Sequence, residues 1–444
     1  MSFDIGNFDI GSFGTVPIPV HGLDEIEKPV LPPSNPVTYI GRSLTPTERG
    51  WGLGEPYCLD LKKSGDQLEA ILIEGPSGTG KTFLLFLLFE AITLLTAEPI
   101  FWVDRKAEWY GWGHPKLPTE DGFEWRTLER VHDEFLYLIV SMGYRLGGST
   151  DPLEAYIDMF TSFFSPENVT VFFPAFAPLL KSQVERFEQI TGYHCEFFKP
   201  SWKLLTPSAA AALFNLNVNT QYMEVYERAF IEARKDAENY SDFVSVLSDF
   251  VSKEKPSKDF AMLVKLLSQD FCFKWFDYKG DNALVRAFAN PGQIFVLTFI
   301  GMPQLPKNAA WVEMWIESAI RAVRAMGRTA TIAIDDLPWY RIGPMDVSQA
   351  LERLIHIESR MPGVGMRKII TVQTARQLPR TISPSSMCYT HIFATKPSYG
   401  FTWKAHPQYE CEMTQVQLDK NYRLMLRPPL NKKLTLPRDA LPLE

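Results

Sequence analysis

The stretch ILIEGPSGTGKTFLLFLLFEAI, residues 71–92, decides the fold of this chain. It contains Gly75-Pro76-Ser77-Gly78-Thr79-Gly80-Lys81-Thr82, which fits the pattern G-x-x-x-x-G-K-[ST] of a phosphate-binding loop. The glycines let backbone N–H groups curl around a di- or triphosphate, the lysine reaches the β- and γ-phosphates, and the threonine hydroxyl binds Mg²⁺. We therefore predict that residues 75–82 bind ATP, with Lys81 as a catalytic cation and Thr82 as a ligand of Mg²⁺.

The residues that flank this loop supply the structural context that it requires. Residues 71–74 indicate a buried strand, and a long apolar helix is expected after the loop. Residues 83–89 are all apolar, but Glu90 interrupts a run that is already shorter than the roughly 20 apolar residues of a membrane-spanning helix. We therefore expect a helix that packs against a parallel sheet and is not inserted in a membrane.

The length, charge and cysteine content limit the classes of protein to which this chain can belong. The 444 residues allow two or three structural units, and the net charge of −7 argues against a surface that is basic overall, while leaving room for a local basic channel. The five cysteines form no C-x-x-C pair, which is typical of a reducing compartment without disulfides or a zinc site. Because residues 1–4 lack the basic start of a secretory signal, we expect a soluble, cytoplasmic protein.

The chain divides into four segments by composition. Residues 1–50 are rich in proline and glycine and predict a flexible tail; the alternative is a peptide that docks a partner through its phenylalanines. Residues 51–130 hold the first part of an ATPase core, and residues 281–444 hold the second. Residues 131–280 lack strong β-branched runs and carry helical patterns, which indicates a mostly helical insertion that is itself a candidate for binding a protein partner.

Continuous apolar runs predict a mostly parallel central sheet with helices on both faces. Together with the phosphate-binding loop, they indicate an α/β fold of the RecA-like P-loop NTPase type. Residues 308–328 predict an amphipathic helix, with Trp311 and Trp315 on one side, Glu313 on the other and Gly327 at its end. The strand-like runs are residues 70–73, 100–103, 294–299, 331–334, 369–372 and 391–394.

Two of these apolar runs end in carboxylates. One leads into Asp335 and Asp336, of which Asp335 is placed to hold Mg²⁺ and Asp336 to polarise the attacking water; the alternative is that both cap the next turn. The other leads into Asp104, with Glu108 four residues later. Because ligands gather at the carboxyl ends of strands in such sheets, Asp104 and Glu108 are candidates to face the γ-phosphate, with a solvated loop as the alternative.

The stretch RMPGVGMRKIITVQTARQLP, residues 360–379, adds a polar strand end and two arginines. The strand ends at Gln373, whose amide can sense the γ-phosphate or position water. Arg360 and Arg376 flank it, and an arginine on a loop can reach the ATP of a neighbouring subunit. Each signal is weak alone, because many strands end in glutamine and surface arginines are common.

In this order, the features resemble the HerA/FtsK family of ATP-driven DNA translocases. Family members carry an Asp…Glu pair after the second strand, then an arginine before a glycine-containing turn, then a strand ending in Thr-Gln or a similar pair. The resemblance covers roughly residues 50–125 and 285–430. The matching stretches are GLGEPYCLDL (52–61), the phosphate-binding loop, VDRKAEW (103–109), IAIDD (332–336), ESRMPGVG (358–365) and IITVQT (369–374).

The resemblance implies a hexameric ring that hydrolyses ATP with Mg²⁺ and moves double-stranded DNA through a central pore. A motor with a helical insertion is more similar to viral genome-packaging or plasmid-transfer members, which implies a viral or plasmid origin. Carried over residue by residue, it implies that Lys81 and Thr82 bind phosphate and Mg²⁺, Asp335 supports the metal, Asp336 is the base, Gln373 is the sensor and Arg360 is the finger acting between subunits.

The base is where this sequence departs from the family. Family members usually have glutamate where Asp336 stands. Aspartate is one methylene shorter, so either the water lies closer to it or Glu108 helps. Both assignments stay open.

The pore-facing residues and the class of motor also stay open. Arg105, Lys106, Arg367 and Lys368 are candidates to grip DNA phosphates, with solvated surface as the alternative. Two rival functions remain: an ATPase that remodels or secretes protein, and a nucleotide-gated assembly module with little turnover. DNA-stimulated hydrolysis would separate the first rival from a DNA motor, and negligible turnover would favour the second.

Overall fold

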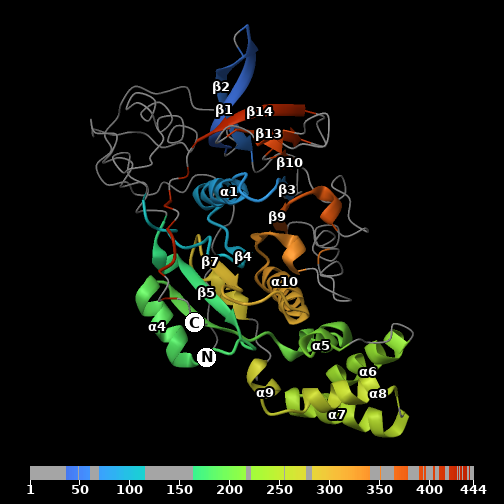
Figure 1. The fold of residues 1–444 in the computed structure, drawn as a ribbon. Helices are drawn as coiled ribbons and strands as arrows, with labels where there is room; N and C mark the ends of the chain where they lie inside the picture. Colours follow the sequence, from blue (N-terminus) through green and yellow to red (C-terminus); the bar gives the residue numbers. More distant parts are fainter. Residues whose placement is uncertain are drawn as a thin grey trace.

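The computed structural model describes residues 37–48, 50–60, 70–115, 164–216, 222–254, 256–276, 283–340, 351, 365–378, 390–393, 395–396, 404–405, 410–415, 420–427, 429, 431–432, 434–437 and 440. One 12-stranded sheet runs through them in the order β2-β1-β14-β13-β10-β3-β9-β8-β4-β7-β5-β6. Figure 1 shows this sheet with α1 and α10 beside it and a group of helices, α5 to α9, at one end of the molecule.

The strands from β10 to β6 are all parallel to their neighbours, as predicted for a RecA-like P-loop NTPase. All six predicted apolar runs form strands in this part. β9 lies between β3, which leads into the phosphate-binding loop, and β8, which leads into the acidic pair. The bounds are β3 Ala70–Glu74, β4 Ile100–Asp104, β5 Val169–Pro174, β6 His194–Phe198, β7 Ile294–Thr298, β8 Ala330–Ile334, β9 Met366–Val372 and β10 Thr390–Phe393.

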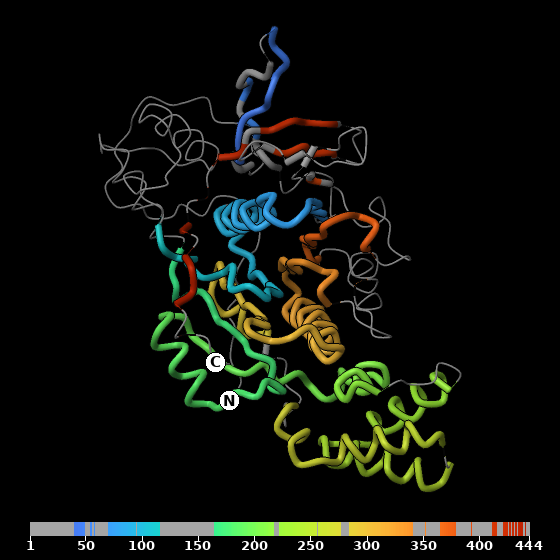
Figure 2. Tube along the Cα trace, viewed as in Figure 1, coloured from blue at the N-terminus to red at the C-terminus, as the bar shows by residue number. Residues whose placement is uncertain are grey.

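Four antiparallel strands extend the sheet beyond β10, and the sequence patterns did not predict them. They are β1 Val37–Thr47, β2 Gly50–Asp60, β13 Glu410–Gln415 and β14 Lys420–Leu426. β1 pairs with β14 across almost the whole length of the chain, which Figure 2 shows as blue and red tubes side by side. Residues 37–47, assigned above to a flexible tail, are therefore a sheet strand; residues 1–36 lie outside the described part.

Helices cover both faces of the sheet, because alternate residues of each buried strand point to opposite sides. Ile71 and Ile73 share a core with α1 (Lys81–Thr96), whereas Leu72 belongs to the core that contains α10 (Pro306–Met326). The helix after the loop is thus the buried core helix that we expected. α10 ends at Gly327, in a left-handed conformation (φ 59°), as predicted. One expectation for α10 is wrong: Glu313, placed on the polar side, is only 4% exposed.

The segment assigned to a helical insertion contains sheet strands as well as helices. β5 and β6 lie within residues 131–280 and extend the parallel sheet beside β7, so the insertion is not separate from the core there. The helical part runs from α5 onward and joins the core where α5 packs against α10. The helices are α4 Lys181–Thr191, α5 Pro207–Leu213, α6 Met223–Asp236, α7 Tyr240–Glu254, α8 Lys258–Leu267 and α9 Cys272–Trp275.

Short elements complete the described part of the chain. A two-stranded sheet pairs β11 with β12, and single turns of 3₁₀ helix connect several larger elements. Among the described residues, no helix is long and apolar enough to cross a membrane. The bounds are β11 Thr395–Lys396, β12 Lys404–Ala405, η2 Pro166–Asn168, η3 Trp202–Leu204, η5 Ala283–Phe288, η6 Leu337–Tyr340 and η7 Ala375–Gln377.

Candidate nucleotide-binding site

The phosphate-binding loop joins the end of β3 to the start of α1. Gly78 and Gly80 adopt left-handed φ angles of 82° and 90°, a conformation that glycine adopts without strain. α1 has no acidic residue in its first turn, and no side chain in the described structure caps it. Its first N–H groups and its positive end therefore remain available to an anion.

Lys81 folds back over this loop. Its Nζ donates hydrogen bonds to the carbonyl oxygens of Gly75, at 2.5 Å, and Pro76, at 2.9 Å. Burial lowers the pKa of Lys81, and nearby Lys106 lowers it further, while Asp335 and Asp336 act in the opposite direction. A phosphate oxygen carries more charge than either carbonyl and would be the stronger acceptor for this ammonium group.

The acidic pair lies at the end of β8 and is held by a threonine from β9. The hydroxyl of Thr371 donates to Oδ1 of Asp335 at 2.6 Å and accepts the backbone N–H of Asp336 at 2.7 Å. Burial raises the pKa of Asp335, which is 3% exposed, and the Thr371 hydrogen bond partly offsets this. Sequence reasoning missed Thr371; the available signal was a hydroxyl residue inside an apolar strand.

Asp336 is held by a cation from the neighbouring strand end. Its Oδ2 accepts a hydrogen bond from Nη2 of Arg105 at 2.6 Å, and Nζ of Lys106 lies 3.8 Å from the same oxygen. The guanidinium of Arg105 also lies 5.6 Å from the centre of the Trp339 ring, within range of a cation–π contact. Asp336 itself has a left-handed φ of 54°, which is unusual for a residue with a side chain.

These contacts correct our expectation for the basic residues. Arg105 pairs with Asp336, and Lys106 lines the same pocket with its Nζ 3.8 Å from that carboxylate. Arg367 and Lys368 lie in β9 and are only 1% and 4% exposed, so they do not form a DNA-binding surface. Arg367 instead donates from Nε to Glu98 at 3.1 Å, inside the core.

Asp104 and Glu108 have different positions, although the sequence suggested the same role. The Asp104 side chain is fully buried and accepts the backbone N–H groups of Lys106, at 3.2 Å, and Glu108, at 3.1 Å. Burial, with the nearby Asp335 and Glu108 charges, raises the pKa of Asp104 to about 8. Asp104 therefore shapes the turn and does not line the pocket, whereas Glu108 does line it.

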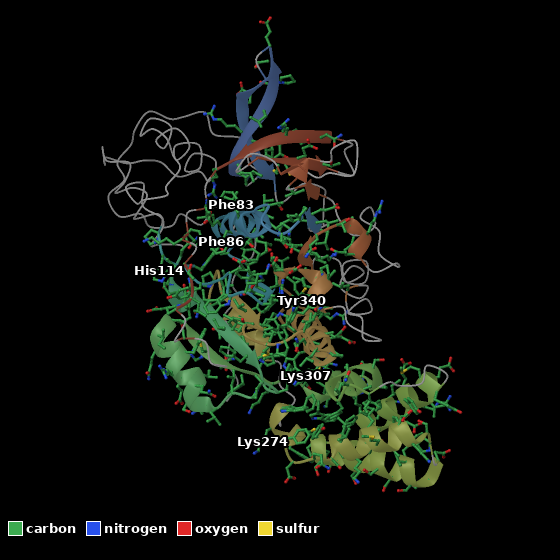
Figure 3. All side chains as sticks on the ribbon, in the orientation of Figure 1. Phe83, Phe86, His114, Lys274, Lys307 and Tyr340 are labelled. Atoms are coloured by element: carbon green, nitrogen blue, oxygen red, sulfur yellow. The ribbon has the colours of Figure 1, made fainter. Side chains whose placement is uncertain are left out.

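One pocket brings most of the predicted residues together. It has a volume of about 310 Å³ and lies where the phosphate-binding loop meets the carboxyl ends of β4 and β8. Figure 3 labels Phe83 and Phe86 on α1, which form part of its apolar wall with Pro429 from the C-terminal segment. The lining residues are Ser77, Gly78, Gly80, Lys81, Thr82, Phe83, Phe86, Lys106, Glu108, Asp335, Asp336 and Pro429.

The predicted sensor, Gln373, does not line this pocket, nor do residues 75, 76 and 79 of the phosphate-binding loop. Gln373 follows β9 at the same edge of the sheet but is exposed and absent from the lining, and its backbone N–H donates to Oε1 of Gln377 at 3.0 Å. Arg360 lies outside the described residues. Their roles as sensor and finger stay predictions.

The pocket suits Mg²⁺ bound together with a nucleotide. Thr82 and Asp335 provide a hydroxyl and a carboxylate, the oxygen ligands that Mg²⁺ prefers. Mg²⁺ is usually held by only one or two protein oxygens, with phosphates and water completing the shell. In keeping with this, the described residues contain no cluster of three His, Cys, Asp or Glu side chains suited to a metal ion.

The strand order and the pocket together define a P-loop NTPase fold of the RecA-like type. No family model matches the sequence, and no curated protein matches it. The assignment therefore rests on β9 lying between β3 and β8, and on the loop and acidic pair that these strands carry.

Three solved structures are similar in fold at low identity. VirB4 of Thermoanaerobacter pseudethanolicus has a TM-score of 0.48 and 11% identity, covering 88% of this chain and 96% of that chain. The bacterial conjugative coupling protein TrwB, in an unbound form, has a TM-score of 0.45 and 11% identity, covering 84% and 87%. The plasmid coupling protein TrwB in complex with a non-hydrolysable GTP analogue has a TM-score of 0.45 and 10% identity, covering 86% and 92%.

Proposed function

We propose that this chain is an ATP hydrolase that moves or packages double-stranded DNA, acting as a hexameric ring. The observation that supports the enzymatic part is the single pocket that Lys81, Thr82, Asp335, Asp336 and Glu108 line at the carboxyl ends of the parallel strands. The DNA substrate and the ring rest on the resemblance to the HerA/FtsK family. A viral or plasmid origin is part of the same proposal.

Each residue of the pocket has a role in this proposal. The loop N–H groups and Lys81 hold the β- and γ-phosphates, and Thr82 and Asp335 hold Mg²⁺. Mg²⁺ bound there neutralises charge on the phosphate oxygens. Thr371 fixes the carboxylate of Asp335 through its 2.6 Å hydrogen bond, so the metal ligand is already oriented before the nucleotide arrives.

The proton of the attacking water has two candidate acceptors. Asp336 and Glu108 both line the pocket and both lie at strand ends that face the loop. Asp336 is engaged by Arg105, so it must be released from this contact, or share it, to act as the base. We retain Gln373 as the proposed sensor and Arg360 as the proposed finger in a neighbouring subunit's site.

DNA would be gripped through its phosphates, without reading of the bases. The basic residues first considered for this contact are engaged in the pocket or buried in β9. The proposal therefore assigns the grip to other lysines and arginines that face the centre of the ring.

Steady-state ATP hydrolysis, measured with and without linear duplex DNA at low and higher salt, tests this function. We expect DNA to raise turnover and added salt to reduce that stimulation, because phosphate contacts release counterions. Lys81→Ala should abolish turnover in both conditions. Turnover that DNA leaves unchanged would instead favour an ATPase acting on protein, and a wild-type chain that binds but never hydrolyses ATP would favour a nucleotide-gated module.

The proposed ring has its own test. Arg360→Ala should block hydrolysis while ATP binding stays intact. Mixing this variant with Lys81→Ala protein should restore part of the activity, because some interfaces then combine an intact loop with an intact finger. Absence of rescue at every mixing ratio would contradict a finger that acts between subunits.

A further inference from the structure

Lys106 lies among the groups that would surround the end of a bound triphosphate. It lines the pocket together with Lys81, Asp335 and Asp336. It is close enough to lower the pKa of both Lys81 and Asp335. The pocket thus contains a second lysine besides that of the phosphate-binding loop, and this lysine follows the carboxyl end of β4.

The ammonium group of Lys106 is less committed to the acidic pair than the guanidinium of Arg105. Arg105 contacts Oδ2 of Asp336 at 2.6 Å, whereas Nζ of Lys106 is 3.8 Å from that same oxygen, beyond hydrogen-bonding distance. The Lys106 side chain is 43% exposed and the Asp336 side chain only 7%. Since Arg105 already pairs with this carboxylate, Lys106 can move to a ligand without leaving Asp336 unpaired.

The backbone under Lys106 is fixed even though its side chain is exposed. Its N–H donates to Oδ1 of the fully buried Asp104, and the next residue, Ala107, adopts a left-handed φ of 55°. A long side chain on a fixed backbone suits a cation that closes on an anion, because only the side chain must reorganise.

We propose that Lys106 is a second phosphate-binding cation, supplied by the same subunit, that contacts the γ-phosphate when ATP binds. Arg105 is then a positioning residue that holds Asp336 so that Lys106 is released to the substrate. This inference rests on the proposed ATP hydrolysis. A cation in the same chain can neutralise charge that develops on the transferred phosphoryl group, as arginine fingers do in other P-loop enzymes.

The substitutions Lys106→Ala and Lys106→Arg test this role, with Lys181→Ala as a matched control. Lys181 lies on α4 and is 86% exposed, and its partner is Glu185, one turn away. We expect Lys106→Ala to lower turnover by about a thousandfold, the lower end of what a finger contributes. Lys106→Arg should recover part of this loss, and Lys181→Ala should match the wild type. Each variant's melting temperature verifies that it is folded.

Ligand binding separates a phosphate contact from a merely structural role. Fluorescently labelled ADP lacks the γ-phosphate, so its dissociation constant should not change in Lys106→Ala. With aluminium fluoride added, ADP mimics the transition state, and Lys106→Ala should lose the tighter binding that the wild type shows. Equal weakening for ADP alone and ADP with aluminium fluoride, or no change in either turnover or binding, would overturn the proposal.

Mixing experiments test whether Lys106 acts within its own subunit. Lys106→Ala and Lys81→Ala proteins should not rescue one another, since every site would then lack one lysine; rescue would overturn the assignment to the same subunit. A different result would contradict the proposed ATP hydrolysis itself: Lys81→Ala protein that turns over ATP as fast as the wild type. Wild-type turnover that needs Lys81 but not Lys106 would overturn this inference alone.

Discussion

A buried carboxylate lies at each end of β4, and the two differ in the partners that they have. At its amino end, Glu98 accepts hydrogen bonds from Nε of Arg367 at 3.1 Å and from the hydroxyl of Thr331 at 2.5 Å. At its carboxyl end, Asp104 accepts backbone N–H groups alone among the described residues, and burial raises its pKa to about 8. A buried charge needs a partner of opposite charge. Glu98 has such a partner in Arg367, whereas Asp104 has none among the described residues.

The same contrast divides the other buried acids. Glu90, in the middle of α1, accepts Nη1 of Arg427 at 2.8 Å and two N–H groups of Asn431. Asp335 has a hydroxyl partner in Thr371 but forms no ion pair within the described structure, and burial raises its pKa. We call Glu90 and Glu98 the closed carboxylates, and Asp104 and Asp335 the open ones. Of the open ones, Asp335 lines the pocket beside the phosphate-binding loop, where a bound cation would complete it, whereas Asp104 is held by the backbone of the turn after β4.

The largest effect is expected when a closed carboxylate loses its arginine. Arg427→Ala leaves Glu90 charged, 0% exposed and without its cation, which should lower the free energy of unfolding by about 3–5 kcal/mol. Urea-induced unfolding measures this loss. The double variant Arg427→Met with Glu90→Gln removes both charges and keeps an amide oxygen for the two N–H groups of Asn431, so it should regain most of the loss. A loss of stability below about 1 kcal/mol, which is typical of an exposed ion pair, would contradict the assignment of Glu90 to the closed carboxylates.

The arginine partners of the closed carboxylates could not be predicted from the sequence. Glu90 and Arg427 are 337 residues apart, and Glu98 and Arg367 are 269 apart, so no local pattern links them. The only local sign was an acid inside an apolar helix, which requires a buried cation somewhere in the chain. The open carboxylates were predictable, because each follows an apolar strand and the ends of parallel strands meet at one edge.

Burial along the strand explains most of the difference between the strands that were predicted and those that were not. β3, β4, β7, β8 and β9 are buried along their length, so their apolar runs alone indicate a parallel sheet. β5 is the exception, because it is equally buried and was not predicted. β1, β2 and β14 mix polar and apolar residues. β1 pairs with β14 from the other end of the chain, and β2 is paired only with β1 at the edge of the described sheet. β6 has a partly exposed sequence, HCEFF, that fits no clear period.

The next effect in size concerns an open carboxylate. Asp335→Asn should raise the Mg²⁺ concentration needed for half-maximal turnover by about a hundredfold. This is the upper end of the loss expected when a residue that orients the metal's ligands is replaced. The substitution should not lower stability, because an amide removes a charge whose burial is unfavourable and can still accept the Thr371 hydrogen bond. Mg²⁺ titrations of turnover and urea unfolding measure the two quantities.

Glu98→Gln is the matched control for Asp335→Asn. It also replaces a buried carboxylate by an amide, but at the amino end of the strands, away from the pocket. Because it leaves Arg367 without its ion pair, it should lower stability and leave the Mg²⁺ dependence unchanged. If both variants shifted the Mg²⁺ dependence, or if Asp335→Asn were the less stable of the two, the open and closed classes would not differ as we infer.

The smallest effect is a pH dependence of stability that only an open carboxylate should show. The pKa of Asp104 is about 8 in the folded chain, against an ordinary value of 3.8 for an aspartate in the unfolded chain. Between these values the folded state binds more protons than the unfolded state, so the free energy of unfolding falls as pH rises and levels off above pH 8. Asp104→Asn cannot ionise and lacks this contribution.

Unfolding of the wild type and Asp104→Asn should therefore be compared from pH 6 to pH 9. The wild type should lose about 2–3 kcal/mol relative to the variant over this interval. Glu90→Gln, in a closed site, should not reproduce this relative change, because the Glu90 carboxylate is already paired with Arg427. Parallel pH curves for the wild type and Asp104→Asn would mean that Asp104 is already paired, and the carboxyl end of β4 would then be as closed as its amino end.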